Sequence, residues 1–309
     1  MSKKGLLALI CLTIATTTFA EKIVLKPNWS KGDSMSYSVV NYTDTTKTIS
    51  CDMTVKVLDN SNDYLMSCVY SNYQDNTGME KMAAMLIGEE KFDKIKAYSP
   101  HYTVSKEGGI LKINNFDEYQ KIFESAKDTS EGFSSIMNGL MSSAIKNLFA
   151  SDEKSFMEIS LKEVVAQHKY FGKEYNTEKE TKGTTDITVN AIKMANAKSS
   201  TKVEKRGDKT VITTTAKLNE KESQSAIQQW MENFMKETAR ESGMDTNDPT
   251  IKKEIKKAVK EYKKAKIWAE LEETAIYDSK TGWMISYESK ETFHSTEGDT
   301  FQRTIISLK

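Results

Sequence analysis

The sequence predicts an α+β protein in which a long, curved antiparallel sheet carries helices packed on one face. Strand patterns rich in Val, Tyr and Thr, separated by polar turns, dominate both ends of the chain, and amphipathic helices lie between them. The stretches YTVSKEGGILKI (102–113) and AIYDSKTGWMIS (275–286) also share one pattern. Each has an apolar strand, a polar turn ending in glycine, and a second apolar strand.

The N-terminus has the composition of a secretory signal peptide. Lys3 and Lys4 precede an apolar run over 5–14, which is too short to cross a bilayer as a helix. Small residues follow at Thr18 and Ala20. We therefore predict a signal peptide over 1–20 that is cleaved after Ala20, and a periplasmic or secreted protein. Residues 21–309 are expected to form a single β-rich domain.

The charge composition gives no support for a nucleic-acid or acidic partner. Lys and Arg number 44, as do Asp and Glu. The overall charge thus argues neither for nucleic acid nor for an acidic partner, and the export signal also speaks against nucleic acid. Only 3 prolines are present, so a stiff proline-rich linker between domains is excluded.

Two cysteines, Cys51 and Cys68, lie in neighbouring predicted strands, CDMTVKV (51–57) and YLMSCVY (64–70). Side chains alternate along a strand, so pairing the two apolar faces puts both thiols on the same side, either opposite or one diagonal apart. Disulfides persist outside the cytosol. Two alternatives follow: a cross-strand disulfide, or two buried free thiols that act as small apolar groups.

Several helices are predicted in the first half. A short helix covers GMEKMAAMLIG (78–88), and Asn115 caps the next helix over 114–125. A longer helix over 133–149 has a broad apolar face that includes Met137 and Met141. A third piece runs over 156–170. The polar, glycine-containing stretch after it is the best boundary between the two halves of the chain.

The second half repeats this order. Strands with the turn KRGDK precede a helix, and Asp248 then caps a second helix, with Pro249 in its first turn. Three or four strands follow. The apolar stripe of the first of these helices contains Ile227, Trp230, Met231, Phe234 and Met235.

The recurring order suggests an internal duplication, with halves over 21–175 and 176–309. Val57 in the first hairpin aligns with Val203, and Gly109 in the later hairpin aligns with Gly282. The alternative is that such hairpins recur by chance in any β-rich protein.

A family resemblance accompanies this pattern. The start LKPNWSKGDSMSYSVV, the turn YDSKTG, the strand WMISYES and the helices between hairpins resemble a group of uncharacterised bacterial envelope proteins. Those proteins are similar to the half-barrel superfamily of periplasmic lipoprotein carriers. The resemblance implies a curved antiparallel sheet closed by helices over an apolar cavity, and it transfers no functional residue.

No motif for catalysis, a cofactor or a metal is present. His101, His168 and His294 are scattered and lack the spacing of zinc ligands. The chain contains neither G-x-S-x-G nor a phosphate-binding loop. DNSNDY resembles the start of a calcium loop but has Tyr64 where that loop requires glycine. We expect a protein that is not an enzyme.

The helix over 251–266 is strongly basic, with eight lysines against Glu254 and Glu261. Such a helix can lie on an anionic membrane or bind an acidic partner, or it can present a solvated face. The lysines available for peripheral membrane contact are Lys252, Lys253, Lys256, Lys257, Lys260, Lys263 and Lys264.

These observations predict an exported protein that binds an apolar ligand, such as a lipid, an acyl chain or a lipoprotein, between sheet and helices. Methionine adapts to irregular apolar ligands, although core packing explains the same stripes. The candidate ligand-binding residues are Trp230, Met231, Phe234, Met235, Met137 and Met141. The alternative is a non-catalytic structural or interaction protein that uses an edge strand or the Lys-rich helix against another envelope protein.

Overall fold

The computed structural model describes residues 21–127, 152–189, 192–241, 244–246, 248–262, 267–296 and 298–309. The predicted signal peptide and the helix predicted over 133–149 lie outside these residues, and so do Met137 and Met141.

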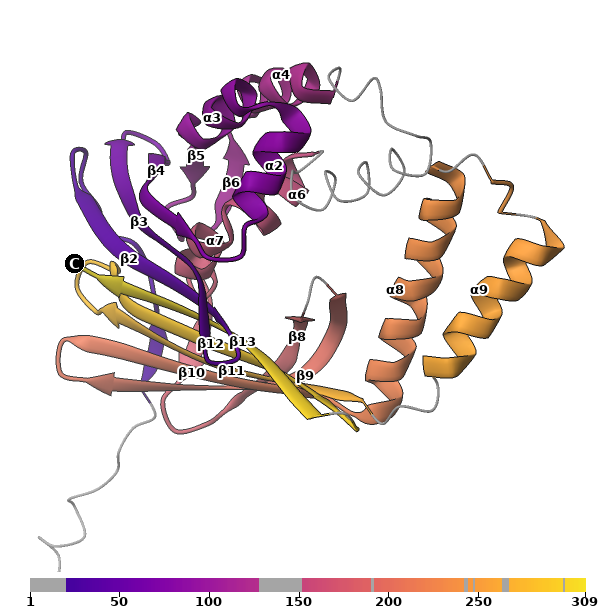
Figure 1. The fold of residues 1–309 in the computed structure, drawn as a ribbon. Coiled ribbons are helices and arrows are strands. Elements are labelled where there is room, and N and C mark those ends of the chain that lie inside the picture. Colours follow the sequence, from indigo (N-terminus) through magenta and orange to yellow (C-terminus); the bar gives the residue numbers. More distant parts are fainter. Residues whose placement is uncertain are drawn as a thin grey trace, which may run out of the picture.

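One eleven-stranded antiparallel sheet organises the molecule, which confirms the predicted fold class (Figure 1). The sheet curves but does not close, because β6 and β8 are its two edges. Its strand order is β6-β5-β4-β3-β2-β13-β12-β11-β10-β9-β8. The strands are β2 (Ser34–Thr43), β3 (Thr46–Asp59), β4 (Tyr64–Asp75), β5 (His101–Val104), β6 (Ile110–Ile113), β8 (Thr181–Val189), β9 (Ile192–Arg206), β10 (Lys209–Leu218), β11 (Trp268–Asp278), β12 (Met284–Ser295) and β13 (Gly298–Leu308).

The helices of the described residues form two groups. The first group gathers over one face of the sheet, whereas α8 and α9 form a separate hairpin beside it (Figure 1). The predicted piece over 156–170 divides at Leu161 into two helices, and α3 was not predicted. The helices are α2 (Met79–Ile87), α3 (Glu89–Ala97), α4 (Phe116–Lys127), α6 (Glu153–Ser160), α7 (Lys162–His168), α8 (Glu220–Glu241) and α9 (Pro249–Tyr262).

The strand order repeats within the sheet. Strands β2, β3 and β4 form a meander, the pair α2–α3 follows, and the hairpin β5–β6 then pairs with β4. Strands β8, β9 and β10 form a second meander, α8–α9 follow, and the hairpin β11–β12 pairs with β10. Across the sheet, the order 6-5-4-3-2 therefore matches 12-11-10-9-8, and β13 joins the two units. This correspondence is the topology expected of a duplicated chain.

The two late hairpin turns meet at Phe171, which is buried. The left-handed glycines of these turns are Gly108 (φ 95°) and Gly282 (φ 75°). Gly108, and not Gly109 as the sequence alignment implied, is thus the counterpart of Gly282. A Cβ atom on Gly108 would overlap Phe171, and one on Gly282 would lie 3.2 Å from its ring. Glycine is needed at both positions for conformation and for space.

The boundary between the halves is tied back to the N-terminus. Strand β7 (Glu174–Asn176) pairs with β1 (Lys22–Val24) in a small separate sheet. Shortly after β1, Trp29 stacks on Trp283 of the second hairpin turn, with ring centroids 4.6 Å apart. Aromatic rings from the N-terminal segment thus pack against the β11–β12 turn.

The two cysteines are free thiols. The predicted register is wrong, because Cys68 lies opposite Val55, four residues from Cys51 along β3. At about 3.3 Å per residue, this offset separates the two positions by roughly 13 Å, too far for a disulfide. Burial raises the pKa of Cys51 to about 12, so the thiol stays protonated and behaves as an apolar group.

Candidate ligand cavities

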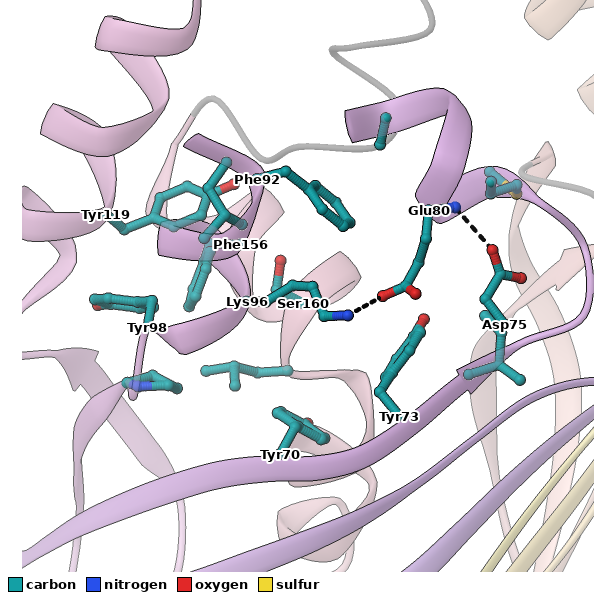
Figure 2. Close-up of a pocket in the computed structure, with 16 residues that line it drawn as sticks. Tyr70, Tyr73, Asp75, Glu80, Phe92, Lys96, Tyr98, Tyr119, Phe156 and Ser160 are labelled. Atoms are coloured by element: carbon teal, nitrogen blue, oxygen red, sulfur yellow. Dashed lines mark hydrogen bonds and ion pairs between the residues drawn. The ribbon is translucent and has the colours of Figure 1, made fainter. Parts of the chain in front are cut away.

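An aromatic cavity lies between the outer part of β4 and the first helix group (Figure 2). Its volume is about 320 Å³. Rings approach it from several elements: Tyr70 and Tyr73 from the sheet, Phe92 from α3, and Tyr119 and Phe156 from α4 and α6. The cavity therefore exists only where separate helices converge on one strand.

Ring contacts hold its inner wall. The centroids of Tyr119 and Phe156 are 4.5 Å apart, and those of Tyr98 and Tyr119 are 5.6 Å apart. Aromatic pairs at such distances stabilise packing beyond the area that they bury. The Tyr98 hydroxyl donates to the backbone oxygen of Asn115 at 2.8 Å. Asn115 was predicted as a helix cap, but its side-chain oxygen accepts from the His101 backbone N–H at 2.8 Å and so joins α4 to β5.

An ion pair borders the cavity (Figure 2). Lys96 of α3 lies 2.7 Å from the Glu80 carboxylate of α2, and its ammonium lies 5.4 Å from the Tyr73 ring centroid. Asp75, at the end of β4, accepts the Glu80 backbone N–H at 2.7 Å. These contacts fix the start of α2 against the sheet and place a polar rim beside the aromatic wall.

A second cavity, of about 460 Å³, adjoins the first. Ile49 and Met79 line both cavities. The second cavity lies between α6–α7 and the middle strands of the sheet. Its sheet side is largely polar, with amide, hydroxyl and carboxyl groups on Asn41, Ser289, Glu291, Gln302 and Thr304.

Two carboxylates with little compensation line this polar cavity. Glu163 of α7 is 7% exposed and accepts one hydrogen bond, from the Tyr70 hydroxyl at 3.2 Å, with the Lys162 ammonium 3.8 Å away. Burial raises the pKa of Glu291 to about 7, against a backbone hydrogen bond from Thr188 that lowers it. At neutral pH Glu291 is thus close to half ionised.

A buried ion pair anchors α7 beside this cavity. The Lys169 ammonium donates to both carboxylate oxygens of Glu273 on β11, at 2.7 and 2.5 Å. The same carboxylate accepts the hydroxyls of Tyr170 at 2.9 Å and Tyr287 at 2.7 Å. Glu273 is 4% exposed and has four donor contacts, which is what a buried carboxylate requires. We assign this network to structure, because its groups satisfy one another.

The residues predicted to bind the ligand do not line either cavity. Trp230, Met231 and Met235 lie on α8, in the separate hairpin, and Trp230 is 36% exposed. The side chain of Phe234, like Met137 and Met141, lies outside the described residues. A cavity does lie between sheet and helices, but other residues line it. Tyr70 lies in a predicted strand and Tyr119 in a predicted helix, and neither was predicted to line a cavity.

The histidines do not gather. Within the described residues, no three His, Cys, Asp or Glu side chains come together in a way that could hold a metal ion. His168 is buried, and its Nδ1 lies 2.8 Å from the Gly108 carbonyl oxygen. Burial lowers the pKa of His168 to about 4, so this imidazole is neutral at physiological pH. Its place under the hairpin turn indicates a packing role.

Comparison with known proteins identifies neither a family nor a curated protein that matches this chain. Within the part of the chain that the structure describes, no helix is long and apolar enough to cross a membrane.

Proposed function

We propose that the protein is a non-enzymatic carrier that holds an apolar ligand, such as a lipid or the acyl chain of a lipoprotein, between the sheet and the first helix group. The aromatic cavity carries this proposal. Its volume of about 320 Å³ falls within the range of small-molecule sites, and aromatic walls with a few polar groups are typical of them. Each methylene buried there contributes about 0.8 kcal/mol to binding.

Cleavage of residues 1–20 as a signal peptide would place this carrier in the cell envelope or outside the cell, where lipids and lipid-modified proteins are available. The composition of these residues supports that placement, as described above.

The experiment is to fill the cavity. Ala83 of α2 lines it and is 4% exposed, so Ala83→Phe puts a ring into the empty space. The matched control is Met85→Phe on the same helix, because Met85 is 79% exposed. We expect an apolar fluorescent probe to bind the wild type and Met85→Phe alike, and Ala83→Phe to bind at least about tenfold more weakly.

Native mass spectrometry of the purified protein provides a second readout, in which the wild type should retain a lipid that Ala83→Phe lacks. Circular dichroism establishes that both variants fold. A wild type that binds no probe and carries no lipid would exclude the proposal.

We also propose that α9 makes peripheral contact with an anionic membrane. Lys252, Lys253, Lys256 and Lys257 are exposed in the structure, whereas Ile255 between them is 5% exposed. Ile255 is therefore covered, and α9 packs on α8. Helix α9 lies at the outer flank of the molecule (Figure 1). The side chain of Lys260, and Lys263 and Lys264 entirely, lie outside the described residues.

A further inference from the structure

The two cavities are adjoining compartments of opposite chemistry. Ile49 and Met79 belong to the walls of both, so the two cavities meet at these side chains. A purely apolar molecule would leave the second compartment, of about 460 Å³, to water. The paired shape fits a molecule with an apolar tail and a polar head.

The charges that face the polar compartment are unequal. Glu158, Glu163 and Glu291 line it. Lys162 also lines it, 3.8 Å from Glu163 and with a half-exposed side chain. The lining thus includes three carboxylates and one ammonium group, besides the guanidinium of Arg303.

Arg303 also borders this compartment, but its guanidinium does not serve it. Nε and Nη2 of Arg303 lie 2.8 and 2.7 Å from the Glu288 carboxylate. Glu288 is the strand neighbour of Tyr287 and Ser289, both of which line the cavity, and neighbouring side chains point to opposite faces of a sheet. The Arg303–Glu288 pair therefore lies on the other face.

The remaining lining can hydrogen-bond to a head group. Asn41 and Ser289 present an amide and a hydroxyl, and the Thr304 hydroxyl donates to the Asn41 side-chain oxygen at 2.7 Å. Among the described residues, Glu163 accepts only the Tyr70 hydroxyl, at 3.2 Å, besides the Lys162 ammonium at 3.8 Å, although it is 7% exposed. A carboxylate this buried is better satisfied by a further donor or cation.

We propose that the ligand is a single amphiphile whose tail occupies the aromatic cavity and whose head, in the polar cavity, carries a positive charge and hydrogen-bond donors. This inference rests on the proposed function and adds the chemistry of the head. A carboxylate or sulfate head is disfavoured, because it would meet Glu163 and Glu291 at close quarters. An ammonium head adds a cation beside Glu163 and Glu291, which otherwise have the Tyr70 hydroxyl and a Thr188 backbone donor as partners.

The test compares heads on one tail. Dodecyltrimethylammonium, dodecyl maltoside and dodecyl sulfate, each below its critical micelle concentration, displace the apolar probe from the full-length protein. We expect the ammonium compound to displace the probe at a concentration at least about tenfold lower than the sulfate, with the maltoside between them. Circular dichroism at each concentration separates displacement from unfolding.

Two variants locate the effect. Glu291→Gln and Glu163→Gln should each reduce the preference for ammonium over sulfate several-fold, measured as the ratio of the two displacing concentrations so that any change in probe affinity cancels. The matched control is Glu272→Gln, since Glu272 is exposed and is the strand neighbour of the buried Glu273. This control makes the same change of net charge without altering the cavity, and it should keep the wild-type preference.

The outcomes separate the two proposals. A wild type that fails to bind the probe overturns the carrier function itself. Probe binding with equal displacement by all three heads, or with sulfate preferred, overturns the inference about the head and leaves the carrier function standing. A preference that survives in Glu291→Gln and Glu163→Gln but is lost in Glu272→Gln also overturns it, because the preference then comes from surface charge.

Discussion

The helices inserted into the two repeats stand at the same place in the strand order and yet do different things. In the first repeat, α2 and α3 lie between β4 and β5 and pack with α4 and α6 around a cavity. In the second, α8 and α9 lie between β10 and β11 and form a hairpin (Figure 1). The hairpin packs through α8 on β9 and β11, and α9 packs on α8.

Side chains account for the difference. The first group directs large rings toward the sheet, and rings that meet at angles leave irregular space between them. Helix α8 meets the sheet through small or compact residues: Ser223 is 0% exposed, Ile227 is 3% exposed, and Ala226 packs on the apolar cluster around Leu271. Small residues allow a helix to approach a sheet closely. The strand order thus determines where the helices are inserted. The size of the side chains that face the sheet determines how closely the helices approach it.

The largest expected effect on stability concerns the Lys169–Glu273 ion pair, which joins the first helix group to β11 of the second repeat. Glu273→Ala removes the carboxylate that binds Lys169, Tyr170 and Tyr287, and leaves the ammonium without its partner. We expect the free energy of unfolding, measured by urea denaturation, to fall by about 3 to 5 kcal/mol. Glu272→Ala, its exposed neighbour, should change stability by less than about 0.5 kcal/mol. Equal effects would show that α7 is not held by this pair.

The second prediction tests whether the α8–α9 hairpin has a membrane role that the first helix group lacks. Reversing Lys252, Lys253, Lys256 and Lys257 to Glu should abolish binding to vesicles that contain anionic lipid. Each lysine near such a surface contributes about 1 kcal/mol, so the four contribute up to about 4 kcal/mol at low salt. Vesicle co-sedimentation at low and high ionic strength measures the effect, which salt should weaken.

The control for that experiment reverses four exposed lysines outside the hairpin: Lys47, Lys56, Lys112 and Lys121. The net charge changes by the same amount as in the α9 variant. Because these lysines lie outside α9, this variant should lose much less vesicle binding. A wild type that ignores anionic vesicles, or a control that loses binding equally, would contradict the membrane contact. The first of these results would favour an acidic protein partner instead.

The third prediction concerns the polar cavity, which lies between the sheet and helices α6 and α7 of the first group. Burial raises the pKa of Glu291 from its ordinary value of 4.5 to about 7. Between these values the folded protein keeps a proton that the unfolded chain has lost. Stability therefore falls as pH rises from about 4.5 to about 7, and it stays lower above that range. Glu291→Gln, which resembles the protonated acid, should be more stable than the wild type at pH 8 by about 2 to 3 kcal/mol.

At pH 4 the same variant and the wild type should have similar stability, because the wild-type carboxyl is protonated in both states. Urea denaturation at the two pH values measures the difference. A gap that does not change with pH would mean that Glu291 is hydrated in the folded state, and hence that helices α6 and α7 do not cover it.

Much of this fold, but little of the site, could be predicted from the sequence. Period-two patterns and matching turns are local, so they reveal the strands and the repeated hairpin. Helix α3 was missed because EEKFDKIKA offers only Phe92 and Ile95 as an apolar stripe. The cysteine register was mispredicted because the turn between β3 and β4 sets the pairing, which places Val57 opposite Met66 and therefore Cys68 opposite Val55. Alternation along each strand specifies the face of a side chain but not how far one strand is displaced along the other.

The cavities depend on distances between elements far apart in the chain. Tyr73 on β4 and Phe156 on α6 look the same in sequence whether they fill a core or line a space. The methionine stripe of α8 looked equally suited to a ligand, but that helix lies in the hairpin and borders neither cavity. Burial of Glu163 was equally hidden, since an amphipathic pattern would place a glutamate in solvent.

The smallest expected difference in stability tests whether the late hairpin turns of the two repeats are equivalent. Gly282→Ala and Gly207→Ala both place a Cβ at positive φ, 75° and 63°, which costs about 1 to 2 kcal/mol at either site. At Gly207, in the β9–β10 turn, the new methyl group meets nothing within 4 Å. At Gly282 it would lie 2.6 Å from the Lys26 carbonyl oxygen, where backbone must move. We expect Gly282→Ala to cost about 1 to 3 kcal/mol more in urea denaturation.

Gly108→Ala should behave like Gly282→Ala, because its methyl group would overlap the ring of Phe171. Gly282 approaches the same ring from the other hairpin turn. If instead Gly108→Ala is as mild as Gly207→Ala, the two late hairpins are not equivalent in the folded protein. The repeat would then be a matter of strand order alone, and Phe171 would pack against one half only. Equal losses at Gly108 and Gly282 would mean that both late hairpin turns are tightly packed, Gly108 against Phe171 and Gly282 against the Lys26 backbone and Phe171, although the two repeats carry differently built helix insertions.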